Sequence, residues 1–282
     1  MVHIRALDPS ASPLDYFGAE LRRKREEAGL KQSELGACIF CTGSLVGQIE
    51  TAKKVPTRDF SERVDTALGT DGYFSRLAGL VLRSQLPHWF QPYAEMEAKA
   101  AYISSYQAQL VDGLLQTERY AWAVLGSRSD EDLDARVAAR MERQRILERE
   151  QPPVTWVVLS EAVLHQEIGG ADVMREQLVH LLTMRDRRWL DVQVLPFEAG
   201  QHPGLMGSFN VLRFDGDPDI VYTEDFVQGH MTANPEAVRE GALRYDQLQA
   251  IALSVENSAA LIARVMEERY DNEPGPDQRD VA

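Results

Sequence analysis

The sequence predicts two domains: an all-α N-terminal domain of four or five helices, and a larger α+β C-terminal domain with a small, mainly antiparallel sheet. Up to about residue 86, apolar residues recur at the spacing of one helix face. Pro87 then interrupts this pattern. Beyond it, short β-branched runs such as residues 154–159 mix with helical runs without strict alternation. The 282 residues, 44% of them hydrophobic, are enough to form two cores.

The N-terminal pattern between residues 29 and 56 is that of a helix-turn-helix. Leu35 and Ile39 repeat at helical spacing, a short non-helical gap follows, and Val46 and Ile49 begin a second apolar stripe. Flanking helices start near residues 15, 57 and 73, and each has one apolar face. The residues of these faces are Phe17, Leu21 and Ala28, then Phe60, Val64 and Leu68, then Tyr73, Phe74, Leu77, Leu80 and Val81.

The C-terminal part mixes predicted strands and helices without an internal repeat. Strands are predicted at residues 154–159, 190–196, 208–214 and 220–223, whereas residues 102–111 are ambiguous between a helix and a strand. Helices are predicted at residues 89–101, 117–125, 133–150, 161–167, 173–187, 235–253 and 256–270. We therefore expect a flexible arm at 1–13, the helical domain at 14–86, the α+β domain at 87–270 and a disordered tail at 271–282.

Composition predicts a cytoplasmic protein. No apolar run has the length of a membrane span, the start lacks the apolar core of a signal peptide, and two cysteines exclude a disulfide scaffold. The net charge of −14, taken alone, argues against nucleic-acid binding. Residues 14–86, however, hold eleven Lys and Arg against ten Asp and Glu, whereas the rest of the chain holds 19 against 34. The first domain can present one basic face, and the few cations per subunit favour binding as a dimer.

The helix-turn-helix resembles the XRE or phage-repressor-like family over about residues 16–68. The residues that carry the resemblance are Leu21, Arg25, Gly29, Leu30, Gln32, Leu35, Ile49, Glu50 and Pro56. In that family the second helix of the motif enters the major groove of DNA. The resemblance places this recognition helix at residues 42–50.

The same resemblance implies a set of DNA-binding positions. One residue caps the recognition helix, four face the bases, one amide bonds a phosphate and three cations lie along the DNA backbone. These positions are Gln32, Thr42, Gly43, Ser44, Gly47, Gln48, Lys53, Lys54 and Arg58. Because two base-facing positions are glycine, direct readout rests mainly on Ser44 and Gln48. Lys31 departs from the family because such helices usually carry a hydroxyl cap there.

The C-terminal part resembles the corresponding domain of WhiJ-like, antitoxin-like actinobacterial regulators. The segments that carry this resemblance are LVDGLLQTERYAWAVL, RQRILERE, VLSEAVLHQEIGG, VQVLPFEAGQHPGLMGSF and VYTED, in that order. Asp112 departs from the family, which usually has proline before GLLQT. The resemblance implies a small partner protein encoded by a neighbouring gene.

Other residue patterns are better explained by structure than by chemistry. Cys38 and Cys41 form a C-x-x-C without further metal ligands nearby, so Cys41 is expected to fill an apolar position, with a redox switch as the minor alternative. Glu161 and His165 lie one helical turn apart but lack a third ligand. The arginines at 136, 140, 143, 145 and 149 alternate with glutamates, which favours a solvated helix face over a second DNA contact. The glycine-bearing loop at residues 200–207 lacks the order of a phosphate-binding loop.

The sequence thus favours a regulator that binds double-stranded DNA as a homodimer at an inverted repeat, with no cofactor and no metal. Its C-terminal domain would bind a small partner protein or a signal. The alternative is an antitoxin-like interaction module whose main role is to hold the small partner, with weak DNA contacts. No catalytic constellation supports an enzyme.

Overall fold

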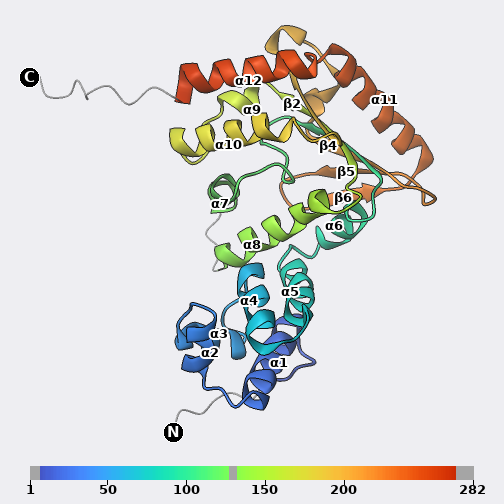
Figure 1. The fold of residues 1–282 in the computed structure, drawn as a ribbon. Helices are drawn as coiled ribbons and strands as arrows, with labels where there is room; N and C mark the ends of the chain where they lie inside the picture. The colour runs from blue at the N-terminus through green and yellow to red at the C-terminus, as the bar shows by residue number, and fades with distance from the viewer. Residues whose placement is uncertain (1–6, 127–131, 271–282) are drawn as a thin grey trace, which may run out of the picture. The chain divides into compact units, whose positions relative to one another are not determined.

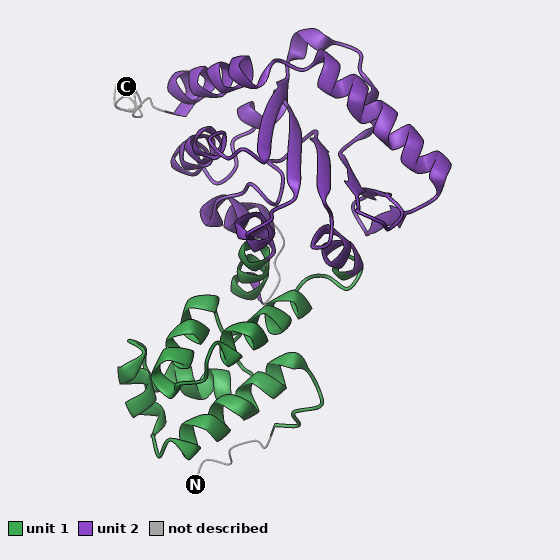
Figure 2. Ribbon diagram, turned by 45° about the vertical axis from the view of Figure 1, so that its right-hand side comes forward, with its two compact units in different colours: residues 1–91, 134–142 green, residues 92–133, 143–282 purple. Residues whose placement is uncertain are grey.

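The structure is a computed structural model that describes residues 7–126 and 132–270. It divides into two compact units (Figure 2). Unit 1 comprises Met1–Gln91 and Asp134–Glu142, and unit 2 comprises Pro92–Leu133 and Arg143–Ala282. The segment 134–142, expected in the C-terminal domain, therefore clusters with the N-terminal helices. The predicted tail at 271–282 and the first six residues of the predicted arm lie outside the described residues.

Unit 1 contains the helices predicted from the apolar spacing (Figure 1). They are α1 (Pro13–Glu27), α2 (Gln32–Cys38), α3 (Gly43–Glu50), α4 (Arg58–Leu68) and α5 (Tyr73–Ser84). Side-chain hydroxyls of Ser12, Thr42 and Thr57 accept backbone hydrogen bonds at the starts of α1, α3 and α4. The apolar faces meet in one core, and the buried Ala135 from the 134–142 segment belongs to it. The predicted helical helix-turn-helix fold is confirmed.

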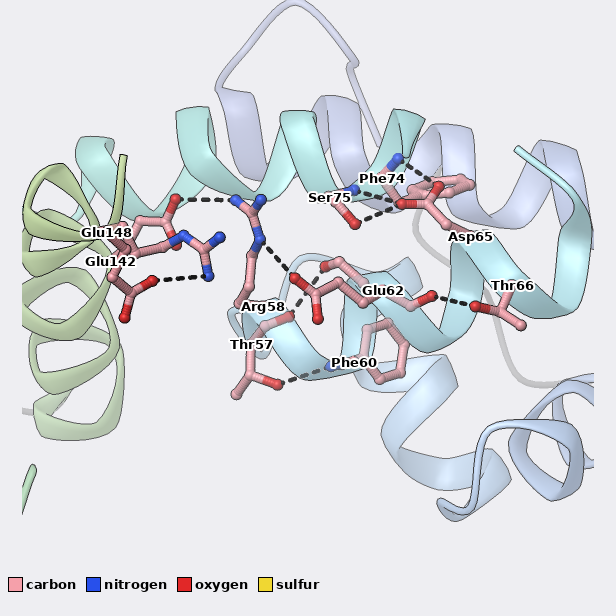
Figure 3. Close-up of polar contacts among 12 residues, drawn as sticks. Thr57, Arg58, Phe60, Glu62, Asp65, Thr66, Phe74, Ser75, Glu142 and Glu148 are labelled. Atoms are coloured by element: carbon pink, nitrogen blue, oxygen red, sulfur yellow. Dashed lines mark hydrogen bonds and ion pairs between the residues drawn. The ribbon is translucent and has the colours of Figure 1, made fainter. Parts of the chain in front are cut away.

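Asp65 supplies the cap that the start of α5 lacks. Gly72 stands at the N-cap without a side chain, and Asp65 accepts hydrogen bonds from the backbone amides of Phe74 and Ser75 at 2.8 Å each (Figure 3). The hydroxyl of Ser75 donates to the same carboxylate at 2.6 Å. Burial alone would raise the pKa of Asp65, but the hydrogen bonds from Ser75, Thr70 and Phe74 outweigh it and lower the pKa below its ordinary value. Asp65 therefore ties α4 to α5 in its charged form.

Phe40 occupies the turn between α2 and α3 in a left-handed conformation, with φ of 57°. Its side chain is 86% exposed, so it adds little to the core. A left-handed conformation costs a non-glycine residue about 1–2 kcal/mol, partly offset by the greater backbone entropy of glycine in the unfolded chain. We expect Phe40→Gly to raise the free energy of unfolding by about 0.5–1 kcal/mol. Urea denaturation of the variant and of the wild-type protein measures this change in the free energy of unfolding.

The control for this prediction is Ala37→Gly, at an exposed position inside α2. Glycine in a helix interior should lower the free energy of unfolding, by up to about 1 kcal/mol. If both substitutions shift stability in the same direction, the turn conformation of Phe40 is not strained.

The described residues of unit 2 contain one six-stranded mixed sheet with the order β3-β2-β1-β4-β5-β6. The strands are β1 (Tyr102–Gln107), β2 (Val154–Ser160), β3 (Leu190–Leu195), β4 (Phe209–Arg213), β5 (Ile220–Glu224) and β6 (Gly229–Thr232). β1 pairs with β2, and β2 with β3, in parallel, whereas β1 with β4, β4 with β5 and β5 with β6 are antiparallel. The predicted α+β architecture is confirmed, and its sheet is mixed because helices cross over between the parallel strands.

Two strands differ from the expectation. The ambiguous run at residues 102–111 forms β1, which lies in the middle of the sheet between β2 and β4. Strand β6, Gly229–Thr232, was not predicted, because GHMT has neither β-branched enrichment nor clear alternation. Both strands are defined by their neighbours in the sheet rather than by their own residues.

Helices cover both faces of this sheet (Figures 1 and 2). Helix α11 packs on one face, whereas α10 and α12 pack together on the other. On the α11 face, Tyr245 donates a hydrogen bond to the carbonyl of Trp156 at 2.7 Å and lies in a cluster with Val158 and Val211. The α-helices described in this unit are α6 (Gln91–Glu97), α7 (Glu118–Gly126), α8 (Leu133–Gln144), α9 (Ala162–His165), α10 (Ala171–Met184), α11 (Pro235–Ile251) and α12 (Val255–Tyr270). Residues 134–142 of α8 belong to unit 1. In the described residues, three short 3₁₀ helices lie at Arg145–Glu148, Phe197–Ala199 and Pro203–Met206. Within residues 7–126 and 132–270, no helix has the length and apolarity needed to cross a membrane.

Candidate nucleic-acid interface

A buried ion pair fixes the two ends of the helix-turn-helix to α1. Arg25 of α1 donates from Nε to Oε1 of Glu50 at 2.5 Å and from Nη2 to Oε2 at 3.0 Å. Glu50 ends α3 and is fully buried, and Arg25 is 7% exposed. Arg25 also donates to the carbonyl of Leu30, just before α2, at 2.6 Å. One guanidinium therefore sets the positions of α2 and α3 relative to α1.

Gln32, the predicted phosphate-contacting amide, joins the same network. Its Nε2 donates to Oε2 of Glu50 at 2.7 Å. An amide nitrogen has two hydrogens, so this bond leaves one for a ligand outside the domain. Its Oε1 lies close to α3, because a Cβ added to Gly47 would be only 3.0 Å from this oxygen. Gln32 thus packs α2 against α3 as well as starting α2.

The two glycines of the recognition helix have a structural cause. A Cβ at Gly43 would lie 2.8 Å from the Cα of Ser33, and one at Gly47 would meet the side chain of Gln32. Real Cβ atoms need more room from backbone atoms than Gly43 has, so α2 and α3 can approach so closely only with glycine at that position. At Gly47 the glycine leaves room for the end of the Gln32 side chain. Gly43 and Gly47 therefore permit the helix packing, and their lack of side chains leaves the outward face of α3 to its other residues.

Helix α3 presents Ser44 and Gln48 outward. Thr42 caps the helix, since its Oγ1 accepts from the amide of Leu45 at 3.2 Å. Val46 and Ile49 are buried in the core of unit 1, whereas Ser44 and Gln48 are exposed. Neither of these two side chains forms a hydrogen bond with another residue in the described part of the chain. The helix therefore offers one hydroxyl and one amide, both able to donate and accept, to a ligand.

The three predicted backbone-contacting cations are not equivalent. Lys53 is exposed and makes no ion pair with the described residues. Lys54 Nζ lies 2.6 Å from Oδ2 of Asp134. Arg58 pairs with Glu62 of its own helix at 3.1 Å and with Glu142 at 3.0 Å, and Figure 3 shows its guanidinium between the two carboxylates. Two of the three cations are therefore partly neutralised by the segment 134–142.

The cysteines fit the space-filling interpretation. Cys41 is half-buried and packs against the core of unit 1, and burial raises the pKa of its thiol, an effect that nearby Arg63 only partly offsets. A raised pKa lowers the thiolate fraction and with it the reactivity. Cys38 is exposed. Across the residues that the structure describes, no three His, Cys, Asp or Glu side chains gather in a way that could hold a metal ion.

The helix-face interpretation of the arginine-rich segment is wrong for one residue. Arg143 is nearly buried in unit 2, and its Nε donates to Oε2 of Glu97 at 2.5 Å and its Nη2 to Oε1 at 2.8 Å. Tyr93 also donates to Glu97, at 3.0 Å, and accepts from Asn210 at 2.7 Å. Burial raises the pKa of Tyr93 well above its ordinary value, so its phenol stays neutral. Sequence reasoning missed this cluster, because its members come from α6, α8 and β4.

Two other patterns are structural contacts. His165 Nε2 lies 3.4 Å from Oε1 of Glu161, as the one-turn spacing implies, but the other oxygen of Glu161 accepts from the amide of Phe197 at 2.8 Å. Asp112, the departure from the resembled family, accepts from the amide of Leu114 at 2.8 Å and from the hydroxyl of Ser105 at 2.6 Å. An aspartate thus holds the turn at this position through hydrogen bonds.

Comparison with known proteins finds both units. Residues 17–73 match the family described as "Helix-turn-helix domain", and residues 90–264, more than half of the chain, match the family described as "Domain of unknown function (DUF5753)". No curated protein and no solved structure matches the chain. The first match confirms the helix-turn-helix predicted from the sequence.

Proposed function

Because the chain belongs to the family described as "Domain of unknown function (DUF5753)" and carries a helix-turn-helix domain in front of that part, we propose that it is a sequence-specific transcriptional regulator. The observation that carries this proposal is that α3 has one buried face and one exposed face. Val46 and Ile49 anchor the helix, while Ser44 and Gln48 face outward without internal partners among the described residues. Such a helix can enter the major groove and read base edges.

The regulator acts as a homodimer on an inverted repeat. One subunit offers few cations, because Lys54 and Arg58 share their charges with carboxylates and Lys53 alone of the three does not. Each phosphate contact contributes to affinity through release of counterions, so two subunits on two half-sites double this contribution. Sedimentation of the protein with a selected duplex would show two protomers per duplex, and a 1:1 complex would contradict the dimer.

Unit 2 serves as a binding domain and not as an enzyme. Outside residues 14–86 the chain holds 34 acidic against 19 basic residues, and most of both lie in unit 2. This acidic balance repels DNA and leaves unit 2 free for another protein. Its resemblance to WhiJ-like, antitoxin-like regulators supports a small partner protein encoded nearby. A titration of that neighbour-encoded protein against the full-length chain tests this, and absence of binding would leave a small-molecule signal as the ligand.

An antitoxin-like role is the second candidate, favoured by the pairing of Lys54 and Arg58 with carboxylates. In this case the chain would hold the small partner and touch DNA only weakly. Partner binding with unchanged operator affinity would favour this role, whereas reciprocal changes of the two affinities would favour a regulator.

Gln48→Ala and Ser44→Ala should relax sequence preference, with little effect on affinity for random duplexes, because base contacts specify and phosphate contacts position. Each lost contact should cost about 1–3 kcal/mol of discrimination between the preferred sequence and other sequences.

Lys53→Ala should lower affinity for all sequences and reduce the slope of log K against log salt by about 1 per subunit. Selection from a random duplex library, followed by titration at several salt concentrations, separates the two outcomes. If all three variants behave alike, α3 is not the reading helix.

A further inference from the structure

The segment of α8 that belongs to unit 1 carries a carboxylate near each of its ends. Asp134 lies 2.6 Å from Nζ of Lys54, and Glu142 Oε1 lies 3.0 Å from Nη1 of Arg58. Both cations follow the recognition helix and are two of the three proposed to contact the DNA backbone. The two carboxylates lie 80 and 84 residues away from them along the chain. These pairs are therefore a product of tertiary packing, not of neighbours on one helix.

The packing around Glu142 accommodates this contact. Gly79 lies in the middle of α5 and is buried, and a Cβ there would come within 3.2 Å of Oε1 of Glu142 and 3.9 Å of Nη1 of Arg58. Glycine weakens a helix interior relative to alanine, but here it leaves room for the carboxylate and the guanidinium to meet. Ala135, between the two carboxylates, is 2% exposed and belongs to the core of unit 1. The segment is thus held in place by apolar packing as well as by charge.

We propose that Asp134 and Glu142, here named the acidic clamp, are an intramolecular competitor of DNA. This inference rests on the proposed function. A DNA phosphate that approaches Lys54 or Arg58 meets a carboxylate already bound to the cation, and the two anions repel each other. DNA must displace the carboxylate or accept a weaker contact. The clamp therefore lowers affinity for DNA of any sequence, and α3 keeps its capacity to read bases.

The experiment uses full-length Asp134→Asn and Glu142→Gln with a labelled duplex of arbitrary sequence, titrated at several salt concentrations. Asp134→Asn should bind more tightly by about 1.5- to 5-fold per subunit, the factor that corresponds to the usual 0.2–1 kcal/mol of an exposed ion pair. Glu142→Gln should also bind more tightly, although the side chain of Glu142 is only 10% exposed. The gain should shrink as salt rises, because salt screens the charges. Asp134 is exposed on 62% of its side-chain surface, so its substitution leaves the core intact.

A double-mutant cycle tests the mechanism. In a Lys54→Ala background, Asp134→Asn should no longer tighten binding, and Glu142→Gln should lose its effect when Arg58 is alanine. Glu240→Gln is the matched control: it removes the same charge from a pair with Arg244 at 2.8 Å in unit 2 and should leave the affinity unchanged. Thermal unfolding of every variant verifies that it is folded.

Two kinds of failure are distinguishable. If the wild-type protein binds duplex DNA and Lys53→Ala weakens it, but neither clamp variant binds more tightly, the clamp is contradicted and the proposed function stands. If Asp134→Asn increased DNA affinity equally in the wild-type and the Lys54→Ala background, the clamp would also be contradicted. The increase would then come from the change in net charge and not from release of Lys54. If neither the wild-type protein nor any variant binds DNA, the proposed function itself fails, and the clamp fails with it.

Discussion

Glu50→Ala should strongly destabilise the helix-turn-helix domain. Its carboxylate is fully buried and binds Arg25 through two hydrogen bonds and Gln32 through a third. Removal of one partner of a buried ion pair typically costs about 3–5 kcal/mol. Of its carboxylate contacts, Arg25 would keep the longer one, to the exposed Glu26 at 3.4 Å. A domain of this size has a total stability of only about 5–15 kcal/mol. We therefore expect a large drop in the unfolding midpoint of unit 1, measured by circular dichroism in urea, and loss of DNA binding.

Glu27→Ala is the matched control for this substitution. Glu27 is half-exposed and pairs with Arg23 and Lys24 on its own helix. Exposed pairs of this kind contribute little to stability, so its loss should barely change the midpoint. Similar midpoints for the Glu50 and Glu27 variants would mean that the buried pair does not hold the domain together. Glu50→Gln should be intermediate, because the amide oxygen can still accept from Arg25.

The second large effect is expected in unit 2, for Glu97→Ala. Glu97 is 1% exposed and accepts two hydrogen bonds from Arg143 and one from Tyr93. Its removal takes away the carboxylate that accepts two hydrogen bonds from the buried guanidinium of Arg143, and the loss of one partner of a buried ion pair again costs about 3–5 kcal/mol. Tyr93 stacks on Tyr222 with 3.8 Å between the ring centroids, so the near-ultraviolet circular dichroism of the tyrosines should report the loss.

The control for Glu97 is Glu240→Ala, which breaks an exposed pair with Arg244 on α11. It should change the free energy of unfolding by less than about 1 kcal/mol. A Glu97 variant as stable as this control would show that the Arg143 cluster adds nothing net to unit 2. Arg143 directly follows Glu142 of the acidic clamp in α8. Titration of the Glu97 variant with DNA therefore also shows whether the loss of the Arg143 ion pair in unit 2 changes DNA affinity.

Local patterns predicted much of the fold and of the candidate site. The apolar spacing of Leu35, Ile39, Val46 and Ile49 was enough to predict the helix-turn-helix, because helix periodicity is a property of neighbouring residues. The resemblance to the XRE family implied Thr42 as the cap of the recognition helix, and its hydroxyl does accept from the amide of Leu45. Strands β2 to β5 were likewise recognisable from short β-branched runs between turn residues.

The pairing of charges, in contrast, was decided by the tertiary structure. Arg143 looks in sequence like one more member of a solvated helix face, since Glu142 directly precedes it and Glu148 and Glu150 follow in the same segment. Its partner Glu97 is 46 residues distant, and only the fold brings the two together and excludes water. The close approach of Ser33 to Gly43, which explains a glycine on the recognition helix, depends in the same way on how α2 packs against α3.

The resemblance to the XRE family implied the position of the recognition helix and the outward-facing positions Ser44 and Gln48, whereas the sequence by itself determined the helices of unit 1. These follow from spacing over a few residues, where the geometry of one helix is sufficient. Only the tertiary structure decided that Lys54 and Arg58 pair with carboxylates of α8, since 80 and 84 residues separate the partners. Ion pairs form wherever the chain brings opposite charges within a few ångströms, and the apolar packing of Ala135 in the core of unit 1 provides this proximity.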